Sequence, residues 1–204
     1  MNFAIVSWIL WIYLGIYVLF HIPIDILMLI RRKEAEYPNP DFKNNIQAVL
    51  FILPSFIFWL YLLGAPILFF YYGISFYGHL IYLLFHSFLS WFLQICGLLI
   101  MSFGLIISCL GRIGRGLYLA KNKEEISMKW GHRIVRHPEY LFYITGFLGL
   151  PLLTLNPILL ILISGIIGYI SFTDTEEKAL INHFGKEYKS YMKKVGKLFP
   201  KIKE

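Results

Sequence analysis

The sequence predicts an all-α integral membrane protein with about five transmembrane helices, a tight C-terminal helical hairpin and a cytoplasmic amphipathic C-terminal helix. The first observation is composition, since 58% of the 204 residues are hydrophobic and only 15% are charged. The second is that three long stretches lack Asp, Glu, Lys and Arg and are long enough for bilayer crossings of ~20 residues. The third is that all 19 Lys and Arg residues lie outside these stretches. A water-soluble domain is therefore excluded.

The first part of the chain, residues 1–111, is expected to hold three spans. No charged residue occurs between positions 2 and 24, and the apolar sequence resumes after Asp25 until Arg31. The second uncharged stretch, 44–111, is about twice the length that one crossing needs, so it predicts two spans, at 46–71 and 80–110. A turn rich in Gly and aromatic residues is expected between them, at 72–78.

The second part, residues 112–204, is expected to hold a loop, the hairpin and the final helix. The uncharged stretch 140–173 is too long for one crossing and contains Asn156-Pro157, a turn signal. Apolar residues then recur at helical spacing over 176–195, with lysines between them. This pattern predicts an amphipathic helix at the membrane surface that closes over the loop before the hairpin. Because Gly185 interrupts the pattern, two short helices are the alternative.

The positions of the basic residues test the number of spans. Four lie between residues 31 and 43, seven between 112 and 136, and eight between 178 and 203. These are alternate loops and the C-terminal tail, so the positive-inside rule places the N-terminus outside and the C-terminus in the cytoplasm. The net charge of +7 then reflects topology. The expected partner is the lipid bilayer and not nucleic acid, in one membrane-embedded domain over 1–204.

Two groups of polar residues are candidates for chemistry. Arg136 and His137 precede Pro138, which suits the first position of a helix, and the free N–H groups of that helix end favour an anion. The alternative is that these cations only anchor the chain at the interface. Glu176-Glu177 follows the hairpin, and its alternative role is a favourable interaction with the helix dipole.

The hairpin brings the two groups together, so that cations face a carboxylate pair. An amino-acid zwitterion needs such a site, with an acceptor for its ammonium and charged donors for its carboxylate. S-adenosylmethionine is one candidate among several. No metal is expected, because Cys96 and Cys109 have no second Cys or His nearby at the spacing of metal ligands.

Two motifs flank the apolar hairpin. They read Arg136-His137-Pro138-x-Tyr140 and Glu176-Glu177-x-x-Leu180-x-x-x-Phe184-Gly185-x-x-Tyr188-x-x-Tyr191. In order and spacing they resemble the isoprenylcysteine carboxyl methyltransferase and phospholipid methyltransferase superfamily, over about the last third of the chain. The resemblance implies an S-adenosylmethionine-dependent membrane methyltransferase with a prenylated or phospholipid substrate. It also implies cofactor contacts from His137, Tyr140 and Glu176, which Arg136 and Glu177 orient.

Two positions depart from that pattern. His132 stands where the family usually has a Tyr, and as the nearest group that takes up a proton it is the candidate catalytic base for an amine acceptor. Phe172 stands where the carboxyl methyltransferases carry an Arg for the substrate carboxylate. An unpaired carboxylate in a low-dielectric site would cost several kcal/mol, so Phe172 favours a neutral or amine-bearing lipid. Arg112, Arg115 and Arg133 are the residues that would replace the missing Arg.

Two other functions remain open on the sequence. Some NADPH-dependent sterol-type membrane reductases share a related Arg-His-Pro region, and a non-catalytic membrane scaffold is the second alternative. Outside the two motifs, His21 and Asp25 share one face of the first span and are candidates for binding a lipid headgroup.

Overall fold

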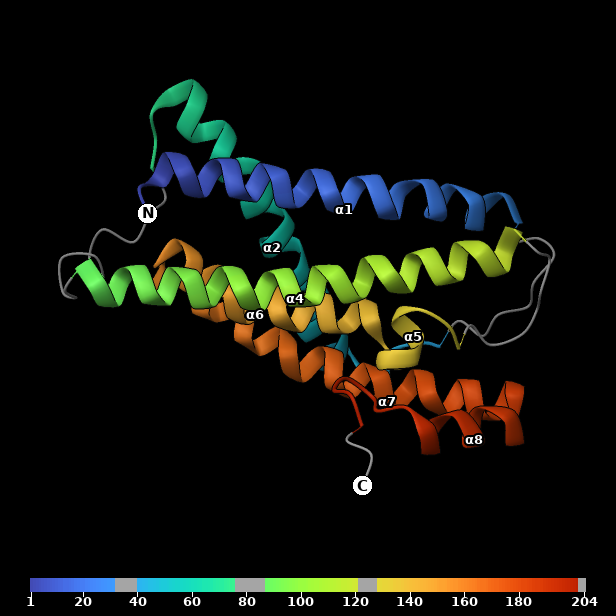
Figure 1. The fold of residues 1–204 in the computed structure, drawn as a ribbon. Helices are drawn as coiled ribbons and strands as arrows, with labels where there is room; N and C mark the ends of the chain where they lie inside the picture. Colours follow the sequence, from blue (N-terminus) through green and yellow to red (C-terminus); the bar gives the residue numbers. More distant parts are fainter. Residues whose placement is uncertain (32–39, 76–86, 121–127, 202–204) are drawn as a thin grey trace.

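The computed structural model describes residues 1–31, 40–75, 87–120 and 128–201, and these residues form helices and their connections (Figure 1). The elements are α1 (Phe3–Arg31), α2 (Asn45–Tyr72), α4 (Ser87–Ala120), α5 (Gly131–Ile134), α6 (Pro138–Thr154), the 3-10 helix η1 (Pro157–Ile163), α7 (Ser164–Phe184) and α8 (Lys186–Lys194). The fold class predicted from the sequence, an all-α membrane protein, is confirmed.

Within the described ranges, four helical segments are long and apolar enough to cross a membrane. They are Phe3–Leu27, Asn45–Tyr72, Phe88–Leu117 and Pro157–Phe184. The fourth predicted span, α6, has 17 residues and is about 25 Å long at the usual helical rise. This length falls short of a complete crossing, so α6 is a short helix enclosed by the others. The start of the third predicted span, from residue 80 to 86, lies outside the described residues.

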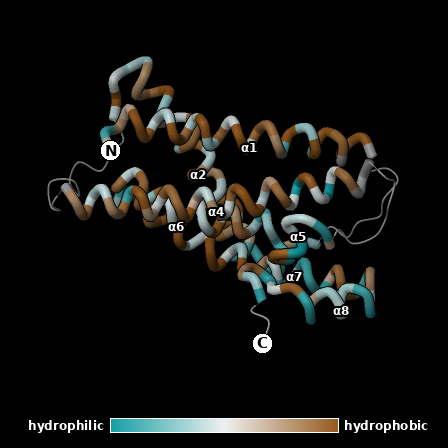
Figure 2. The backbone as a smooth tube through the Cα atoms, viewed as in Figure 1, coloured by the Kyte–Doolittle hydropathy of each residue, from teal (hydrophilic) through white to brown (hydrophobic). Residues whose placement is uncertain are grey.

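The core lies where α4 and α6 run side by side, between α1 on one side and α7 on the other (Figure 1). Phe142 and Phe147 of α6 are fully buried there, as is Phe58 of α2. In contrast, α1 and α2 expose many large apolar side chains. Figure 2 shows the hydrophobic residues along these helices in brown. Exposed apolar faces of this kind match a lipid environment.

The predicted hairpin and its turn are confirmed. Helix α6 ends at Leu155, which adopts the left-handed conformation, and the side chain of Asn156 accepts a hydrogen bond from the amide of Ile158. Pro157 then opens η1, which leads into α7. The returning arm therefore begins with a 3-10 helix, a detail that the apolar sequence did not predict.

The C-terminal segment differs from one amphipathic helix over 176–195. Helix α7 continues through Glu176 to Phe184, and Gly185, with φ of 56°, separates it from α8. The alternative with a break at Gly185 is therefore correct. The apolar residues of α8, Tyr188 and Tyr191, pack against Leu180 of α7, so they face the protein.

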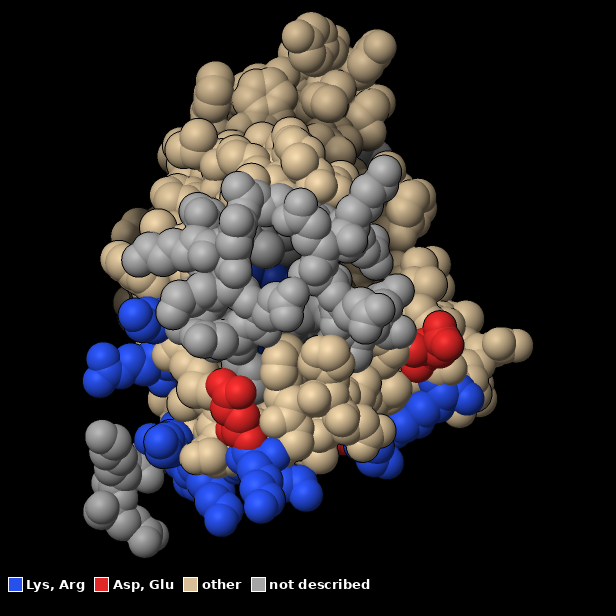
Figure 3. All heavy atoms as spheres, turned by 90° about the vertical axis from the view of Figure 1, so that its right-hand side faces the viewer, with Lys and Arg blue, Asp and Glu red and all other residues tan. Residues whose placement is uncertain are grey.

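The lysines of this segment face outward. Figure 3 shows Lys and Arg gathered on the lower part of the end face that carries α8. The exposed lysines of the two helices are Lys178, Lys186, Lys189, Lys193 and Lys194. Their side of the molecule is the one that the positive-inside rule assigns to the cytoplasm, which stays a prediction.

Candidate functional site

The segment before α6 is fixed by the C-terminal tail. Val135 forms a parallel bridge with Gly196. The amide of Arg136 donates to the carbonyl of Gly196 at 2.9 Å, and that of His137 donates to Lys197 at 3.2 Å. Pro138 needs no such partner, because it has no N–H and occupies the first position of α6. The tail thus closes over the loop before the hairpin, as predicted, and sets the backbone from which Arg136 and His137 project.

The same segment packs closely on α4. A Cβ atom on Gly131 would lie 2.4 Å from the backbone nitrogen of Gly111 and 2.5 Å from the carbonyl oxygen of Ile107. Only a residue without a side chain allows this approach. The loop is therefore held between α4 on one side and the C-terminal tail on the other.

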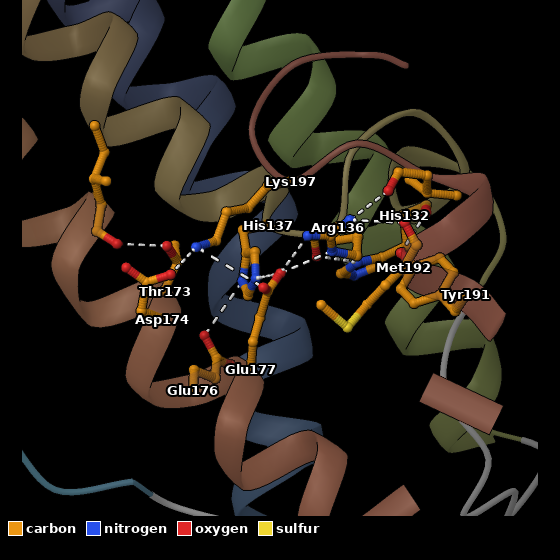
Figure 4. A network of polar contacts seen from close by, with 12 residues as sticks. His132, Arg136, His137, Thr173, Asp174, Glu176, Glu177, Tyr191, Met192 and Lys197 are labelled. Carbon is orange, nitrogen blue, oxygen red and sulfur yellow. Dashed lines mark hydrogen bonds and ion pairs between the residues drawn. The ribbon is translucent and has the colours of Figure 1, made fainter. Parts of the chain in front are cut away.

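Arg136 and Glu177 form a buried ion pair. Both Nε and Nη2 of Arg136 lie 2.7 Å from Oε1 of Glu177, and each side chain is less than a tenth exposed. The third guanidinium nitrogen, Nη1, donates to the carbonyl of Met192 in α8 and to that of Val195 just after it (Figure 4). Arg136 therefore ties the start of α6, the C-terminal half of α7 and the end of α8 together.

His137 lies between the two glutamates (Figure 4). Its Nε2 is 3.1 Å from Oε1 of Glu177, and its Nδ1 is 3.3 Å from Oε2 of Glu176. Burial lowers the pKa of His137, but the hydrogen bonds and charges of both carboxylates outweigh it and raise the pKa above its usual value. The imidazole ring stacks on Tyr140, with 5.4 Å between ring centroids. The site thus favours a protonated His137.

Of the two glutamates, Glu176 is the one with a carboxylate oxygen that can still accept a hydrogen bond. Its Oε2 atom is buried and, among the described residues, has the 3.3 Å ion pair with Nδ1 of His137 but no well-aligned hydrogen bond. The hydroxyl of Tyr140 also interacts with this carboxylate. A buried carboxylate oxygen without a hydrogen-bond donor is costly, so this atom is the natural acceptor for a cationic donor on a ligand.

One further residue, Lys197, completes the cluster and was not predicted from the sequence. The ammonium group of Lys197 lies 2.5 Å from Oδ1 of Asp174 and 3.8 Å from Oε2 of Glu177. Lys197 follows α8 and reaches the cluster only because the tail folds back, and no motif marks that return. We refer to Arg136, His137, Glu176, Glu177 and Lys197 as the α7 cluster.

His132 lies apart from the glutamates. Its ring Nδ1 is 3.3 Å from the carbonyl oxygen of Arg136, and its own carbonyl accepts a hydrogen bond from the Tyr191 hydroxyl. Burial lowers the pKa of His132 to about 4. The ring is therefore neutral near pH 7 and a weak base. The structure brings the five predicted cofactor residues together but leaves the predicted catalytic base outside their cluster.

Phe172 stands among other aromatic rings. It is 9% exposed, and its ring centroid lies 4.8 Å from Phe42, 5.0 Å from Phe51 and 6.2 Å from Tyr140. We call these four residues the aromatic wall. One member of the wall, Tyr140, also contacts Glu176, so the wall adjoins the glutamate pair. Its apolar surface offers no partner for a carboxylate.

The remaining ionisable candidates are engaged elsewhere. Arg112 pairs with Asp25 at 2.7 Å and with Glu139 at 2.8 Å. His21 is buried between α1 and α4, where Nε2 lies 2.9 Å from the hydroxyl of Ser108. Asp25 and His21 share a helix face as predicted, but only Asp25 retains substantial exposure, at 43% of its side chain. Arg112 is therefore not free to replace the Arg missing at position 172.

Comparison with known proteins gives a family and distant relatives. Residues 87–187 match the family model described as "Phospholipid methyltransferase". A Methanethiol S-methyltransferase of Pseudomonas deceptionensis is 38% identical over 72 residues, which cover 35% of this chain and 27% of that protein. One from Pseudomonas sp. (strain GM41(2012)) is 34% identical over 80 residues, covering 39% and 30%.

A third relative, Methanethiol S-methyltransferase 1 of Bradyrhizobium diazoefficiens, is 35% identical over 69 residues, covering 34% of this chain and 24% of that protein. The chain thus aligns with less than a third of the length of each of these curated relatives. No solved structure matches the chain significantly. The family-model match, residues 87–187, contains the Arg136 motif and the glutamate pair.

Proposed function

Residues 87–187 belong to the phospholipid methyltransferase superfamily of membrane methyltransferases, and on this premise we propose that the protein transfers a methyl group from S-adenosylmethionine to an acceptor in the bilayer. The observation that carries the proposal is the buried Oε2 atom of Glu176, which lies beside His137 and Tyr140 and accepts no well-aligned hydrogen bond. It lies in the region that the family model covers.

The α7 cluster fits the amino-acid end of S-adenosylmethionine. That end is a zwitterion, and its ammonium requires an acceptor with hydrogen-bonding capacity left, which Oε2 of Glu176 provides. His137 is a charged donor next to it and suits the carboxylate of the ligand. When bound, S-adenosylmethionine supplies an electrophilic methyl group on a sulfonium. We therefore assign Glu176, His137 and Tyr140 to direct cofactor contact.

Arg136 and Glu177 act as positioning residues in this proposal. The Arg136–Glu177 pair is saturated within the protein, and Glu177 holds the ring of His137 from the side opposite to Glu176. A ring fixed on both sides loses little entropy when a ligand binds. Methyl transfer depends mainly on orientation, for which such fixed groups supply up to ~7–11 kcal/mol.

The aromatic wall argues against a carboxylate as the methyl acceptor. Phe172 is packed among rings, and Arg112 is committed to Asp25 and Glu139, so neither stabilises an anionic substrate group. A prenylcysteine carboxylate would therefore find no cationic partner in Phe172 or Arg112. We propose an amine or a thiol as the acceptor, and the thiol chemistry in the names of the relatives agrees with the second choice.

The test is methyl transfer by the purified protein in detergent or nanodiscs. It is incubated with methyl-labelled S-adenosylmethionine and, separately, phosphatidylethanolamine, methanethiol and a prenylcysteine analogue. We expect label in the amine or the thiol, its loss in Glu176→Gln, and its retention in Glu187→Gln, an exposed carboxylate of α8. Label only in the prenylcysteine ester would overturn the acceptor assignment. Binding of NADPH in place of S-adenosylmethionine would overturn the methyltransferase proposal in favour of a reductase.

A further inference from the structure

The outer face of α8 is densely and unevenly charged. Six lysines but only one acidic residue, Glu187, occur between positions 185 and 201. Figure 3 shows blue side chains crowded on the lower part of the end of the molecule that carries α8. Four of the lysines belong to α8 itself and are exposed, and we call them the α8 lysine face: Lys186, Lys189, Lys193 and Lys194.

The described part of the chain does not neutralise this face. None of its four lysines forms an ion pair with a carboxylate among the described residues. Glu187 has no lysine three or four positions away within α8, so it does not offset the charge along the helix. Lys186 and Lys189 are three residues apart and Lys189 and Lys193 are four, spacings at which like charges repel. An anionic partner would relieve this repulsion.

The opposite face of α8 is buried in the protein. Tyr188 and Tyr191 pack against Leu180 of α7, so the helix has no apolar face left to insert between lipid chains. Interfacial amphipathic helices bind a membrane by such insertion, which the packing of α8 rules out. The attraction that α8 offers is therefore electrostatic, and its partner is a surface that carries negative charge.

The position of α8 selects the bilayer as the source of that charge. The last candidate span among the described residues ends at Phe184, and α8 begins two residues later, at Lys186. Figure 1 shows α8 running back beside α7, and at its end the carbonyls of Met192 and Val195 accept hydrogen bonds from Arg136, just before α6. Basic residues that adjoin a membrane span in this way are attracted to anionic lipid headgroups.

The segment after α8 adds an exposed aromatic ring. Leu198 is buried in the same hydrophobic cluster as Phe142 of α6, whereas the next residue, Phe199, is 70% exposed. Lys201, two residues further along, is also exposed. Aromatic side chains flanked by basic residues are typical of the level at which lipid headgroups meet a protein. Phe199 therefore suits the same partner as the lysines.

We propose that the α8 lysine face and Phe199 dock on the anionic headgroups of the bilayer that holds the protein. This docking goes beyond the proposed function and does not depend on it. The amides of Arg136 and His137 donate to carbonyls of the segment that follows α8. Anionic lipid that immobilises this segment therefore also steadies the backbone of the α7 cluster.

Hydrogen exchange of the full chain in nanodiscs tests the docking. Exchange over residues 186–201 is compared in phosphatidylcholine alone and in a mixture of phosphatidylcholine and phosphatidylglycerol, roughly two to one, which supplies anionic headgroups. In the wild type, phosphatidylglycerol should slow exchange about fivefold or more, the change that one lysine near an anionic surface contributes. The double variant Lys189→Gln, Lys193→Gln should lose this protection. The matched control Lys189→Arg, Lys193→Arg keeps both charges and should retain it.

Equal exchange of the wild type in the two bilayers would overturn the docking, as would protection that survives in the double glutamine variant. If that variant does not fold, the wild type decides alone, because its protection must vanish at about 1 M salt, where the Debye length is ~3 Å. Protection by a soluble poly-glutamate peptide, with none by phosphatidylglycerol, would assign the face to an acidic protein and would also overturn the proposal. These readouts do not use S-adenosylmethionine, so failure of the proposed function leaves them unchanged.

Discussion

The two polar clusters beside the first turn of α6 are built differently. In the α7 cluster, Glu177 is 8% exposed and Oε1 is shared by Arg136 and His137. In the second, the Arg112 cluster, Arg112 pairs with Asp25 and Glu139, whose side chains are 43% and 30% exposed. The contrast indicates that the Arg136–Glu177 pair holds the architecture more firmly than Arg112 does, and we propose that the cofactor binds beside this pair, at Glu176.

Arg136→Ala should have the largest effect. Removal of one partner leaves Glu177 buried without its main counter-charge and releases the carbonyls of Met192 and Val195. We expect a loss of about 3–5 kcal/mol of stability. Thermal unfolding in detergent measures it, and limited proteolysis should show early cleavage of the released C-terminal segment.

Arg133→Ala is the matched control, because Arg133 is exposed and lies on the same short segment. It should change stability by less than about 0.5 kcal/mol. If the two substitutions were equally mild, the Arg136–Glu177 pair would not hold the architecture.

Arg112→Ala should be less damaging than Arg136→Ala. Its two carboxylates are partly exposed, so water replaces the lost guanidinium more readily than it does at Glu177. The expected loss is about 1.5–3 kcal/mol, as for hydrogen bonds to charged groups. The same unfolding assay measures it, and a loss larger than that of Arg136→Ala would reverse the comparison.

The two neighbouring histidines should respond to pH in opposite directions. The pKa of His132 is lowered to about 4, so its neutral form is favoured and its contribution to stability falls as the pH drops below about 6.5. At pH 5 that loss amounts to roughly 2 kcal/mol. His137 has a raised pKa, so its contribution is complete below pH ~6.5 and is lost as the pH rises through its folded-state pKa.

Unfolding between pH 5 and 9 separates the two histidines. His132→Asn should flatten the acid side of the stability profile relative to the wild type, and His137→Gln should flatten the alkaline side. An unchanged profile in His137→Gln would mean that the glutamates do not keep this ring protonated.

Lys197→Gln should have the smallest effect. Its closest partner, Asp174, is 55% exposed, and Glu177 is 3.8 Å away. Exposed ion pairs contribute about 0–1 kcal/mol, so Tm should change little and should become less sensitive to salt. A large loss of stability would show that Lys197 belongs to the closed part of the α7 cluster.

The sequence predicted the α7 cluster because its parts are local. Pro138 marks the start of one arm of the hairpin and Asn156-Pro157 marks the turn, so the spacing alone brings His137 close to Glu176. The break between α7 and α8 was also predictable, because it depends on a single residue, Gly185. The fold class likewise depends on composition and on uncharged stretches, which need no knowledge of packing.

The Arg112 cluster could not be predicted in the same way. Asp25, Arg112 and Glu139 come from three helices, and their contact depends on how each helix is rotated about its axis. The rotation of a membrane helix is hard to predict from apolar sequence, because the residues that face lipid and the residues that face protein are equally hydrophobic. Lys197 was missed because the return of the tail depends on backbone pairing with Arg136 and His137.

Binding of S-adenosylmethionine tests the central claim most directly. Isothermal titration calorimetry compares the wild type with Glu176→Gln and with the exposed control Glu187→Gln, and the Tm of each variant is recorded to show that it is folded. We predict that the wild type and Glu187→Gln bind alike, and that Glu176→Gln binds about tenfold or more weakly at an unchanged Tm. Equal affinity of folded Glu176→Gln and wild type, or no binding by the wild type, would contradict the assignment of the α7 cluster to the cofactor.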